Sequence, residues 1–351
     1  MRVPPIINCF LFYHKNKSKA RIVLQHNTEN DILPLGDDIV VCVWILLGMF
    51  AVIIAAAYLC FRLTFFVSPR QKRQAKDLPQ GKVYEPFRQQ IENWAIQTDE
   101  IPHKEFSIVS FDGLQLFGKY YECQKGAPIE LMFHGYRGTA RRDLSGGVQR
   151  CFQLGRNALI VDQRCSNQSE GNVITFGIYE HKDCLQWVDF LVNHFGNDVK
   201  IILTGISMGA ATVLMAAGKP LPQNVIGVLA DCGYTGAKDI IQKVIKQIGL
   251  SPTLCYFFVK LGARIFGGFD LEEDSPQQSL KHCKIPVIFF HGDADDFVPC
   301  EMSKLNYDTC SCKKKLVIVK DAGHGLCFPV DPETYLDELK EFFKEENAPI
   351  G

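Results

Sequence analysis

The stretch "IILTGISMGAATVLMAAG" (201–218) decides the fold. A β-branched apolar run ends at Thr204, and a glycine stands two residues before and two residues after Ser207. This order predicts a strand, a sharp turn at Ser207 and a helix over 208–217 that ends at Gly218. Glycines on both sides leave room for a turn that exposes the serine oxygen at the top of a sheet. By itself the stretch is also compatible with the small-residue start of a buried helix. The segments around it decide between these two interpretations.

Those surroundings predict an α/β fold. Two strand-like runs, "EFSIVSF" and "LQLFGKYYEC", flank Asp112-Gly113, which is typical of a hairpin turn, and a helix is expected just before them. Apolar runs then alternate with amphipathic stretches such as 179–196. Strands that are apolar on both faces and separated by helices indicate a mostly parallel sheet covered on both sides. The expected strands are 129–133, 157–162, 199–205, 225–231, 285–292 and 315–319.

The alternation of predicted strands and helices is interrupted at about 233–284. Here "AKDIIQKVIKQIG" and "SPTLCYFFVKLGARIFGG" predict two helices, the second opening on Ser251 and Pro252. Helices inserted at the carboxyl end of a parallel sheet are where a substrate cap lies. The dense apolar content predicts a short helical cap that lines an acyl pocket; an ordinary crossover that has grown is the alternative.

The run "IVVCVWILLGMFAVIIAAAYLCF" (39–61) holds 23 residues without a charge. That length crosses about 30 Å of hydrocarbon as a helix. A core helix would show a polar face, and a signal peptide begins nearer the N-terminus, although cleavage after Ala57 is an alternative. The sequence therefore predicts an N-terminal tail (1–38), a transmembrane helix (39–61), a basic juxtamembrane linker (62–82) and an α/β domain (83–348).

Positive charge near this run predicts its orientation. Asp37 and Asp38 precede it, and a group of basic residues follows, namely Arg62, Arg70, Lys72, Arg73 and Lys76. Because cytoplasmic flanks are rich in Lys and Arg, we expect a single-pass protein whose large domain faces the cytoplasm.

Composition excludes several classes of protein. Among 351 residues, 47% are hydrophobic and 22% charged, with a formal net charge of -1. No basic stripe interleaves with aromatic residues, so no nucleic-acid partner is expected. The fourteen cysteines are scattered, and their spacing matches no zinc site. We expect reduced thiols and no metal or cofactor.

A serine nucleophile needs a base and an orienting carboxylate. Of the nine histidines, His324 alone follows the last predicted strand between two glycines, in "KDAGHGLCF". That loop can place an imidazole over the sheet edge. The acid is expected from a strand end between them, where "FFHGDADDFVP" (289–299) offers Asp293, Asp295 and Asp296.

These motifs resemble the α/β-hydrolase superfamily over roughly residues 104–345. In serine-aminopeptidase-like and small esterase members the acid lies in the pattern H-G-x-x-D-x-x-V-P, which selects Asp295 here. The order Ser207, Asp295, His324 matches the family's order. "MFHGYRGTA" resembles the family's His-Gly loop, which implies an oxyanion hole made of the backbone N–H groups of Tyr136 and Met208.

A second segment departs from the family pattern. "VDQRCSNQSEG" is similar to D-x-R-G-x-G-x-S, but Cys165 and Asn167 stand where glycines are usual, which puts the local turn in doubt. We expect Arg164 to brace this loop by pairing with Glu180 or Asp183. More narrowly, the chain resembles membrane-anchored bacterial α/β hydrolases of the Firmicutes type.

The resulting hypothesis is a serine esterase of the carboxylesterase or lipase kind, acting through a Ser207–Asp295–His324 triad and an acyl-enzyme on a small-molecule or lipid acyl substrate. One alternative is a peptidase or amidase of the serine-aminopeptidase type. The other is a non-catalytic membrane-tethered binding protein with the same fold. The sequence does not indicate the acyl-chain length or the oligomeric state.

Overall fold

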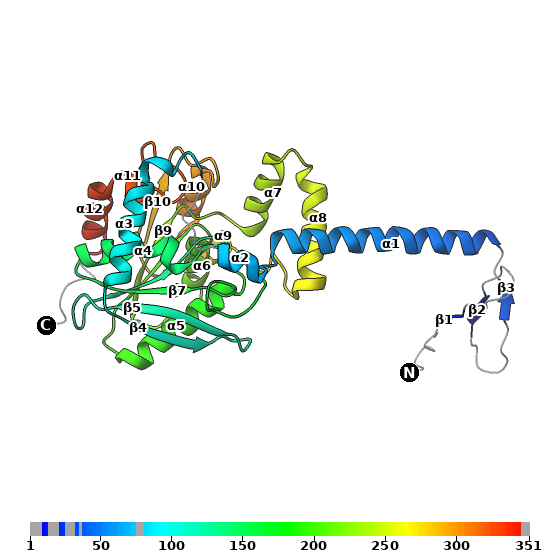
Figure 1. The fold of residues 1–351 in the computed structure, drawn as a ribbon, viewed down its shortest axis with the longest axis horizontal. Helices are drawn as coiled ribbons and strands as arrows, with labels where there is room; N and C mark the ends of the chain where they lie inside the picture. Colours follow the sequence, from blue (N-terminus) through cyan, green and yellow to red (C-terminus); the bar gives the residue numbers. More distant parts are fainter. Residues whose placement is uncertain (1–8, 13–20, 25–31, 35–36, 75–80, 345–351) are drawn as a thin grey trace. The chain divides into compact units, whose positions relative to one another are not determined.

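The computed structural model describes residues 9–12, 21–24, 32–34, 37–74 and 81–344 (Figure 1). These residues belong to two compact units, which divide between Leu59 and Cys60. In the first unit, three short antiparallel strands lie within the segment predicted as a tail: β1 (Cys9–Phe12), β2 (Arg21–Leu24) and β3 (Ile32–Pro34).

Helix α1 (Asp37–Thr64) contains the predicted span 39–61 and extends a few residues past it at each end. Within the described part of the chain it is the one helix long and apolar enough to cross a membrane, by length and composition. Its last residues, Cys60–Thr64, belong to the second unit. Helix α2 (Pro69–Gln74) then lies in the predicted basic linker, of which residues 75–80 are outside the described residues.

The second unit is built on an eight-stranded sheet in the order β11-β10-β9-β8-β6-β7-β5-β4. Neighbours from β7 through β11 are parallel, whereas β4 and β5 form an antiparallel hairpin at one edge. The prediction of a mostly parallel sheet is confirmed. The strands are β4 (His103–Val109), β5 (Gln115–Tyr121), β6 (Ile129–Phe133), β7 (Asn157–Asp162), β8 (Ile201–Ile206), β9 (Val225–Asp231), β10 (Val287–Gly292) and β11 (Lys314–Val319).

Helices cover both faces of this sheet because its central strands are apolar on both sides. In β10, for example, Val287 and Phe289 pack in one apolar cluster and Ile288 and Phe290 in another. The first cluster includes residues of α5 (Glu180–Phe195), α6 (Met208–Ala217) and α9 (Pro276–Leu280), with α10 (Cys300–Thr309) beside them. The opposite face carries α4 (Ala140–Gln153), α11 (Cys327–Val330) and α12 (Pro332–Phe342). The segment η1 (Glu85–Phe87) and α3 (Arg88–Glu100) follows α2, and α3 packs on α4.

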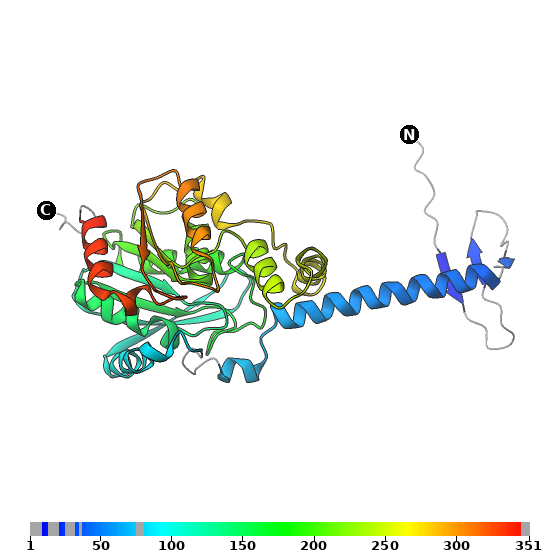
Figure 2. The same ribbon diagram turned by 90° about the horizontal axis from the view of Figure 1, so that it is seen from above.

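The two helices predicted between β9 and β10 are present. They are α7 (Ala237–Gln247) and α8 (Pro252–Gly262), and a π-helical turn, η2 (Ala263–Gly267), follows α8. Figures 1 and 2 place α7 and α8 on the side of this unit away from α12.

The loop after β7 keeps its turn without the usual glycines. Cys165 and Asn167 take the left-handed backbone conformation themselves, with φ of 69° and 41°. Asparagine adopts this region readily, whereas cysteine does so at a cost. Arg164 braces the loop through a two-pronged ion pair with Asp183, at 2.7 and 2.8 Å. Glu180 instead accepts hydrogen bonds from the Thr175 and Gly177 N–H groups.

One buried charge cluster ties β6 to α4. Glu130 is fully buried and pairs with Arg150 on one side and with Arg156 at 2.7 Å on the other. Burial by itself would raise the pKa of Glu130, but the two guanidinium charges outweigh burial and lower that pKa to about 2. Because the pKa is lowered by folding, the cluster stabilises the fold above the pKa of an unfolded glutamate, and this stabilisation is lost as the pH falls toward 2.

We therefore expect Glu130→Gln to lower the free energy of unfolding at neutral pH by about 3–5 kcal/mol, since two buried cations lose their counter-charge. The variant should also lose less stability than the parent between about pH 4.3 and pH 2, the window set by the unfolded and folded pKa values. Thermal unfolding of the detergent-solubilised chain over this pH range measures both. Glu85→Gln, at an exposed pair with Arg88, is the control and should change little.

Candidate active site

Ser207 stands at the junction of β8 and α6 in a strained conformation. Its φ is 57° and its ψ is -115°, a region that L-residues rarely adopt. A Cβ at position 205 would lie 2.1 Å from the Gly209 carbonyl oxygen, and one at position 209 would lie 2.0 Å from the Phe133 carbonyl oxygen. Both glycines are therefore required by the close approach of backbone, and the serine hydroxyl is held at the carboxyl end of the sheet.

A chain of two hydrogen bonds joins Ser207 to His324 and Asp295. The His324 Nε2 atom lies 3.0 Å from Ser207 Oγ, and its Nδ1 atom lies 2.7 Å from Asp295 Oδ2. An ionised carboxylate only accepts, so Nδ1 donates to Asp295 and Nε2 is left to accept the Ser207 proton. The structure thus brings the three predicted residues together in one hydrogen-bonded chain.

The Asp295 carboxylate is held on both of its oxygens. Its Oδ1 atom accepts the N–H groups of Phe297 at 2.9 Å and Val298 at 2.8 Å. The His291 Nε2 atom lies 3.3 Å from Asp295 Oδ2. Burial would raise the pKa of Asp295, but hydrogen bonds from His291 and His324 outweigh it, so the pKa lies well below the usual range. Asp295 is thus ionised at neutral pH.

Contacts with Tyr84 and Phe297 hold the loop that carries His324. The Tyr84 hydroxyl donates to the His324 carbonyl oxygen at 3.1 Å. The Phe297 ring contacts the imidazole edge to face, with centroids 5.0 Å apart. Gly325 follows with φ of 68° and turns the chain into the last helices. These contacts keep the imidazole above Ser207.

The two N–H groups predicted to form an oxyanion hole lie beside Ser207. Within the described residues, neither the Tyr136 N–H nor the Met208 N–H has a hydrogen-bond partner. The Gln163 N–H donates to His134 Nε2, so the His134 Nδ1–H donates to the Gly135 carbonyl oxygen at 2.8 Å. That carbonyl shares a trans peptide with the Tyr136 N–H, and the two point in opposite directions. His134 therefore positions the Tyr136 N–H.

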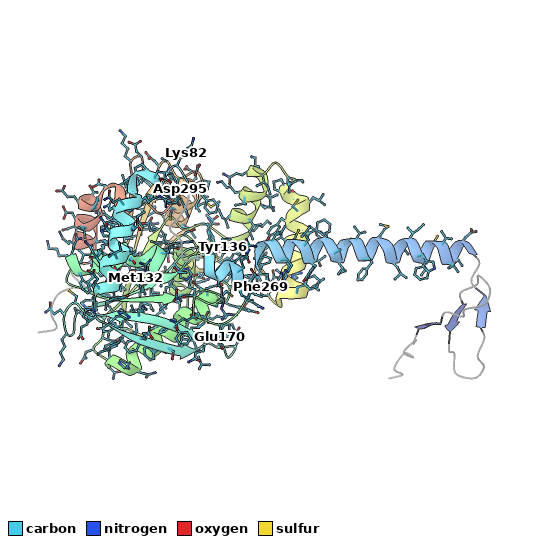
Figure 3. The ribbon with its side chains drawn as sticks, in the orientation of Figure 1. Lys82, Met132, Tyr136, Glu170, Phe269 and Asp295 are labelled. Carbon is cyan, nitrogen blue, oxygen red and sulfur yellow. The ribbon has the colours of Figure 1, made fainter. Side chains whose placement is uncertain are left out.

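The same loop is anchored to the last turn of α1, inside the second unit. The Tyr136 hydroxyl donates to the Thr64 carbonyl oxygen at 2.6 Å. The Arg137 guanidinium donates to the carbonyl oxygens of Leu63 at 2.9 Å and Phe66 at 3.3 Å. Carbonyl oxygens at the end of a helix lack partners within the helix, so a cation is favoured there. Figure 3 labels Tyr136 at this junction.

Comparisons with known proteins bear on the fold of the chain. No family model matches the chain. Uncharacterized protein YqkD of Bacillus subtilis is 29% identical over 201 residues, which are 56% of this chain and 65% of the relative. The chain thus spans less than two thirds of the length of that relative.

Solved structures match over most of the chain. The esterase Pf2001 of Pyrococcus furiosus superposes with a TM-score of 0.59 at 20% identity, covering 72% of this chain and 96% of the esterase. The α/β hydrolase GrgF of Penicillium sp. sh18 superposes with a TM-score of 0.55 at 19% identity, covering 71% of this chain and all of GrgF. The chain therefore has the α/β-hydrolase fold. The narrower resemblance to anchored Firmicutes members stays a prediction.

A cavity of about 480 Å³ opens onto Ser207 and His324 in this α/β-hydrolase domain. Its apolar wall is formed by residues just before and within α3, in the loop after β10 and around α11. These residues are Val83, Tyr84, Ile91, Trp94, Phe297, Leu326 and Phe328. The polar wall comes from α4, which contributes Arg142, Asp143 and Arg150. The cavity is of the size that small organic ligands occupy.

The structure places no described residue of the predicted cap, 233–284, in the wall of this cavity, so its role in an acyl pocket stays a prediction. Among the described residues, none from this segment lines the cavity at Ser207 or a smaller one of about 220 Å³ beside Met208. The inner side chains of α7 and α8 instead fill an apolar cluster with the end of α1 and residues 173–179. This packing accounts for the apolar side chains on the inner face of α8.

Sequence reasoning also missed two carboxyl groups in the cavity wall. Asp143 accepts the Gly135 N–H at 3.1 Å and pairs with Arg142, so it helps to shape the oxyanion loop. Asp231 ends β9, and its carbonyl oxygen accepts the Ser207 N–H at 2.8 Å. Burial raises the pKa of Asp231, and its Oδ1 atom has no partner among the described residues. In the sequence, only the position of Asp231 at the end of a predicted strand indicated that it could lie at the site.

Three thiols converge away from the cavity, at the amino ends of β10 and β11. The Cys312 Sγ atom lies 3.2 Å from that of Cys310 and 3.6 Å from that of Cys283. A tetrahedral metal ion needs a fourth ligand, and no described His, Asp or Glu joins the three. Cys232 also approaches Asp295 and His324, but burial raises its thiol pKa far above the usual range.

The close packing of backbone atoms around Ser207 predicts that alanine at position 209 destabilises the fold. Gly209→Ala places a Cβ 2.0 Å from the Phe133 carbonyl oxygen, so β6 and α6 must separate. We expect a loss of at least about 3 kcal/mol in the free energy of unfolding, measured by chemical denaturation in detergent. Gly236→Ala is the matched control, because its Cβ would lie 3.4 Å from the Ser275 Cβ, in ordinary contact. Equal stability of the two variants would contradict the predicted strain.

Proposed function

We propose that this chain is a serine hydrolase that cleaves acyl esters through an acyl-enzyme. The observation that carries the proposal is the relay of hydrogen bonds from Ser207 through His324 to Asp295, at 3.0 and 2.7 Å. The shared fold does not specify a chemistry by itself. The likeness to the esterase Pf2001 supports an ester as the bond that is cleaved.

In the proposed acylation step, Ser207 Oγ bonds to the substrate carbonyl carbon while its proton passes to His324 Nε2. The carbonyl oxygen becomes an oxyanion, which the N–H groups of Met208 and Tyr136 stabilise. The bond to the leaving alcohol then breaks, and His324 returns the proton to that alcohol. Water repeats the sequence on the acyl-enzyme, which releases a carboxylic acid and restores Ser207.

The cavity supports an apolar substrate. Tyr84, Trp94 and Phe328 offer aromatic surface beside Ser207, whereas the polar groups of α4 lie on another wall. Apolar and aromatic walls with a few placed polar groups are typical of small-molecule sites. A small-molecule or lipid ester with an apolar acyl group fits this wall.

Fluorophosphonate labelling of the detergent-solubilised chain tests the proposal. We expect the intact chain to be labelled and Ser207→Ala to be unlabelled, with hydrolysis of nitrophenyl esters reduced at least about 10³-fold. Ser145→Ala removes another buried hydroxyl, which bonds to the Arg141 carbonyl oxygen, and should behave like the parent. Absence of label on the folded parent would favour the non-catalytic alternative, and faster cleavage of aminoacyl nitroanilides than of esters would favour a peptidase.

We further propose that α1 crosses the membrane once and that the α/β-hydrolase domain faces the cytoplasm. Support comes from the length and apolar composition of α1 and from the basic residues that follow it.

Cys123 is an exposed thiol of the second unit and reports this orientation. A membrane-impermeant maleimide should modify the peptide containing Cys123 only after cells that express the chain are lysed, as read by peptide mass spectrometry. Cys123→Ser is the control for assignment of the peptide. Equal modification in intact cells would place the domain outside.

A further inference from the structure

Helix α8 is apolar on two opposite faces. Tyr256 and Val259 of α8 recur at helical spacing with Ala263, the first residue of η2; all three are at most 5% exposed, because they pack in the cluster that also contains the end of α1. Leu254 and Phe257 recur on the other face and are 60% and 56% exposed. A helix in water normally places polar residues on its outer face, so an outer face of this kind indicates a covering partner.

The exposed apolar surface extends beyond α8 at both of its ends. Ile248 and Leu250, in the turn from α7, are 64% and 53% exposed. Ile265, in η2, is 48% exposed. We call these five residues the apolar face: Ile248, Leu250, Leu254, Phe257 and Ile265.

The apolar face is joined to the end of α1 by aromatic contacts within the second unit. The rings of Phe61 and Phe266 have centroids 5.9 Å apart, and those of Phe65 and Phe269 are 5.3 Å apart, edge to face. Ile265 directly precedes Phe266. Phe269 is labelled near this end of α1 in Figure 3.

Phe61 is also the last residue of the uncharged run 39–61, and Arg62 follows it. A helix that crosses a bilayer leaves the hydrocarbon near the first basic residue, because long cationic side chains reach to the headgroups. Covalent connection therefore places Phe61, and with it Phe266 and Ile265, at the edge of the bilayer. The 11 residues of α8 extend about 16 Å from there.

We propose that the apolar face lies in the interfacial layer of the bilayer that α1 crosses, so that α8 is a second anchor in the plane of the membrane. The inference rests on α1 crossing that bilayer and not on the proposed hydrolysis. Interfacial helices bury their apolar side about 5–10 Å into the boundary between headgroups and acyl chains. Here the side of α8 away from lipid packs on the domain instead of facing water.

Substrate does not account for this surface, because the cavity at Ser207 includes none of the five residues. A second copy of the chain is the competing occupant. The bilayer is favoured because the apolar face continues directly into Phe266, which contacts the last residue of the uncharged run.

Quenching of tryptophan emission by brominated lipids tests the inference on the full chain in phosphatidylcholine nanodiscs. Trp44 lies in α1, whereas Trp94 stacks on Phe328 and Trp187 is 1% exposed. A Trp44→Phe background therefore retains Trp94 and Trp187, and its quenching is the baseline that is subtracted. Into it, Phe257→Trp or Leu254→Trp adds a reporter on the apolar face, and Ile96→Trp adds one at a 48% exposed position of α3 as the matched control.

We expect both apolar-face reporters to lose about twofold in emission with lipids brominated near the top of the acyl chain and less with lipids brominated near its end. The Ile96→Trp reporter should be unaffected. Reporters at 254 and 257 that stay unquenched overturn the inference, whether Trp44 of the parent is quenched or not. Blue-shifted but unquenched emission would assign the surface to a second copy. Ser207→Ala should leave the quenching unchanged, so failure of the proposed chemistry is read separately.

Discussion

Backbone crowding at the turn between β8 and α6 is the constraint on which the rest of the domain depends. A Cβ at position 205 would lie 2.1 Å from the Gly209 carbonyl oxygen, and one at position 209 would lie 2.0 Å from that of Phe133, so β6, β8 and α6 pack this closely only with glycine at both positions. Ser207 takes a strained φ of 57° because this packing permits no relaxation. The free N–H groups at the start of α6, the loop after β6 and the loop of His324 all converge on that point.

The loop after β6 shows how distant elements contribute to the site. His134 and Asp143 hold Gly135 from within the domain, whereas Tyr136 and Arg137 donate to carbonyl oxygens at the end of α1. The last turn of α1 is therefore part of the support of the proposed oxyanion hole. The end of the proposed membrane anchor thus contacts a loop that lies beside Ser207.

Segments that are far apart in the chain also form the cavity. Its apolar wall comes largely from residues 83–94, which precede the first strand of the sheet, and from the loops after β10 and β11. The helices between β9 and β10 pack against the end of α1 and residues 173–179, and Lys243 of α7 donates to the Phe297 carbonyl oxygen at 2.7 Å, beside the cavity. The inserted helices thus contribute no described residue to the wall of this cavity, and the outer surface of α8 is the one we assign to the bilayer.

The sequence by itself determined the fold class, the strands of the eight-stranded sheet near their observed bounds, and the three residues that the structure joins by hydrogen bonds. These features are encoded locally, in periodicity, in glycines beside Ser207 and in side chains at strand ends. Cys165 and Asn167 could hold their turn because φ depends on the residue and on its surroundings together. Only the tertiary structure decided which segments line the cavity, what α8 packs against and where Asp231 lies. Those depend on contacts between residues far apart in the chain, and an apolar side chain looks the same in sequence whether it faces a core, a substrate or lipid.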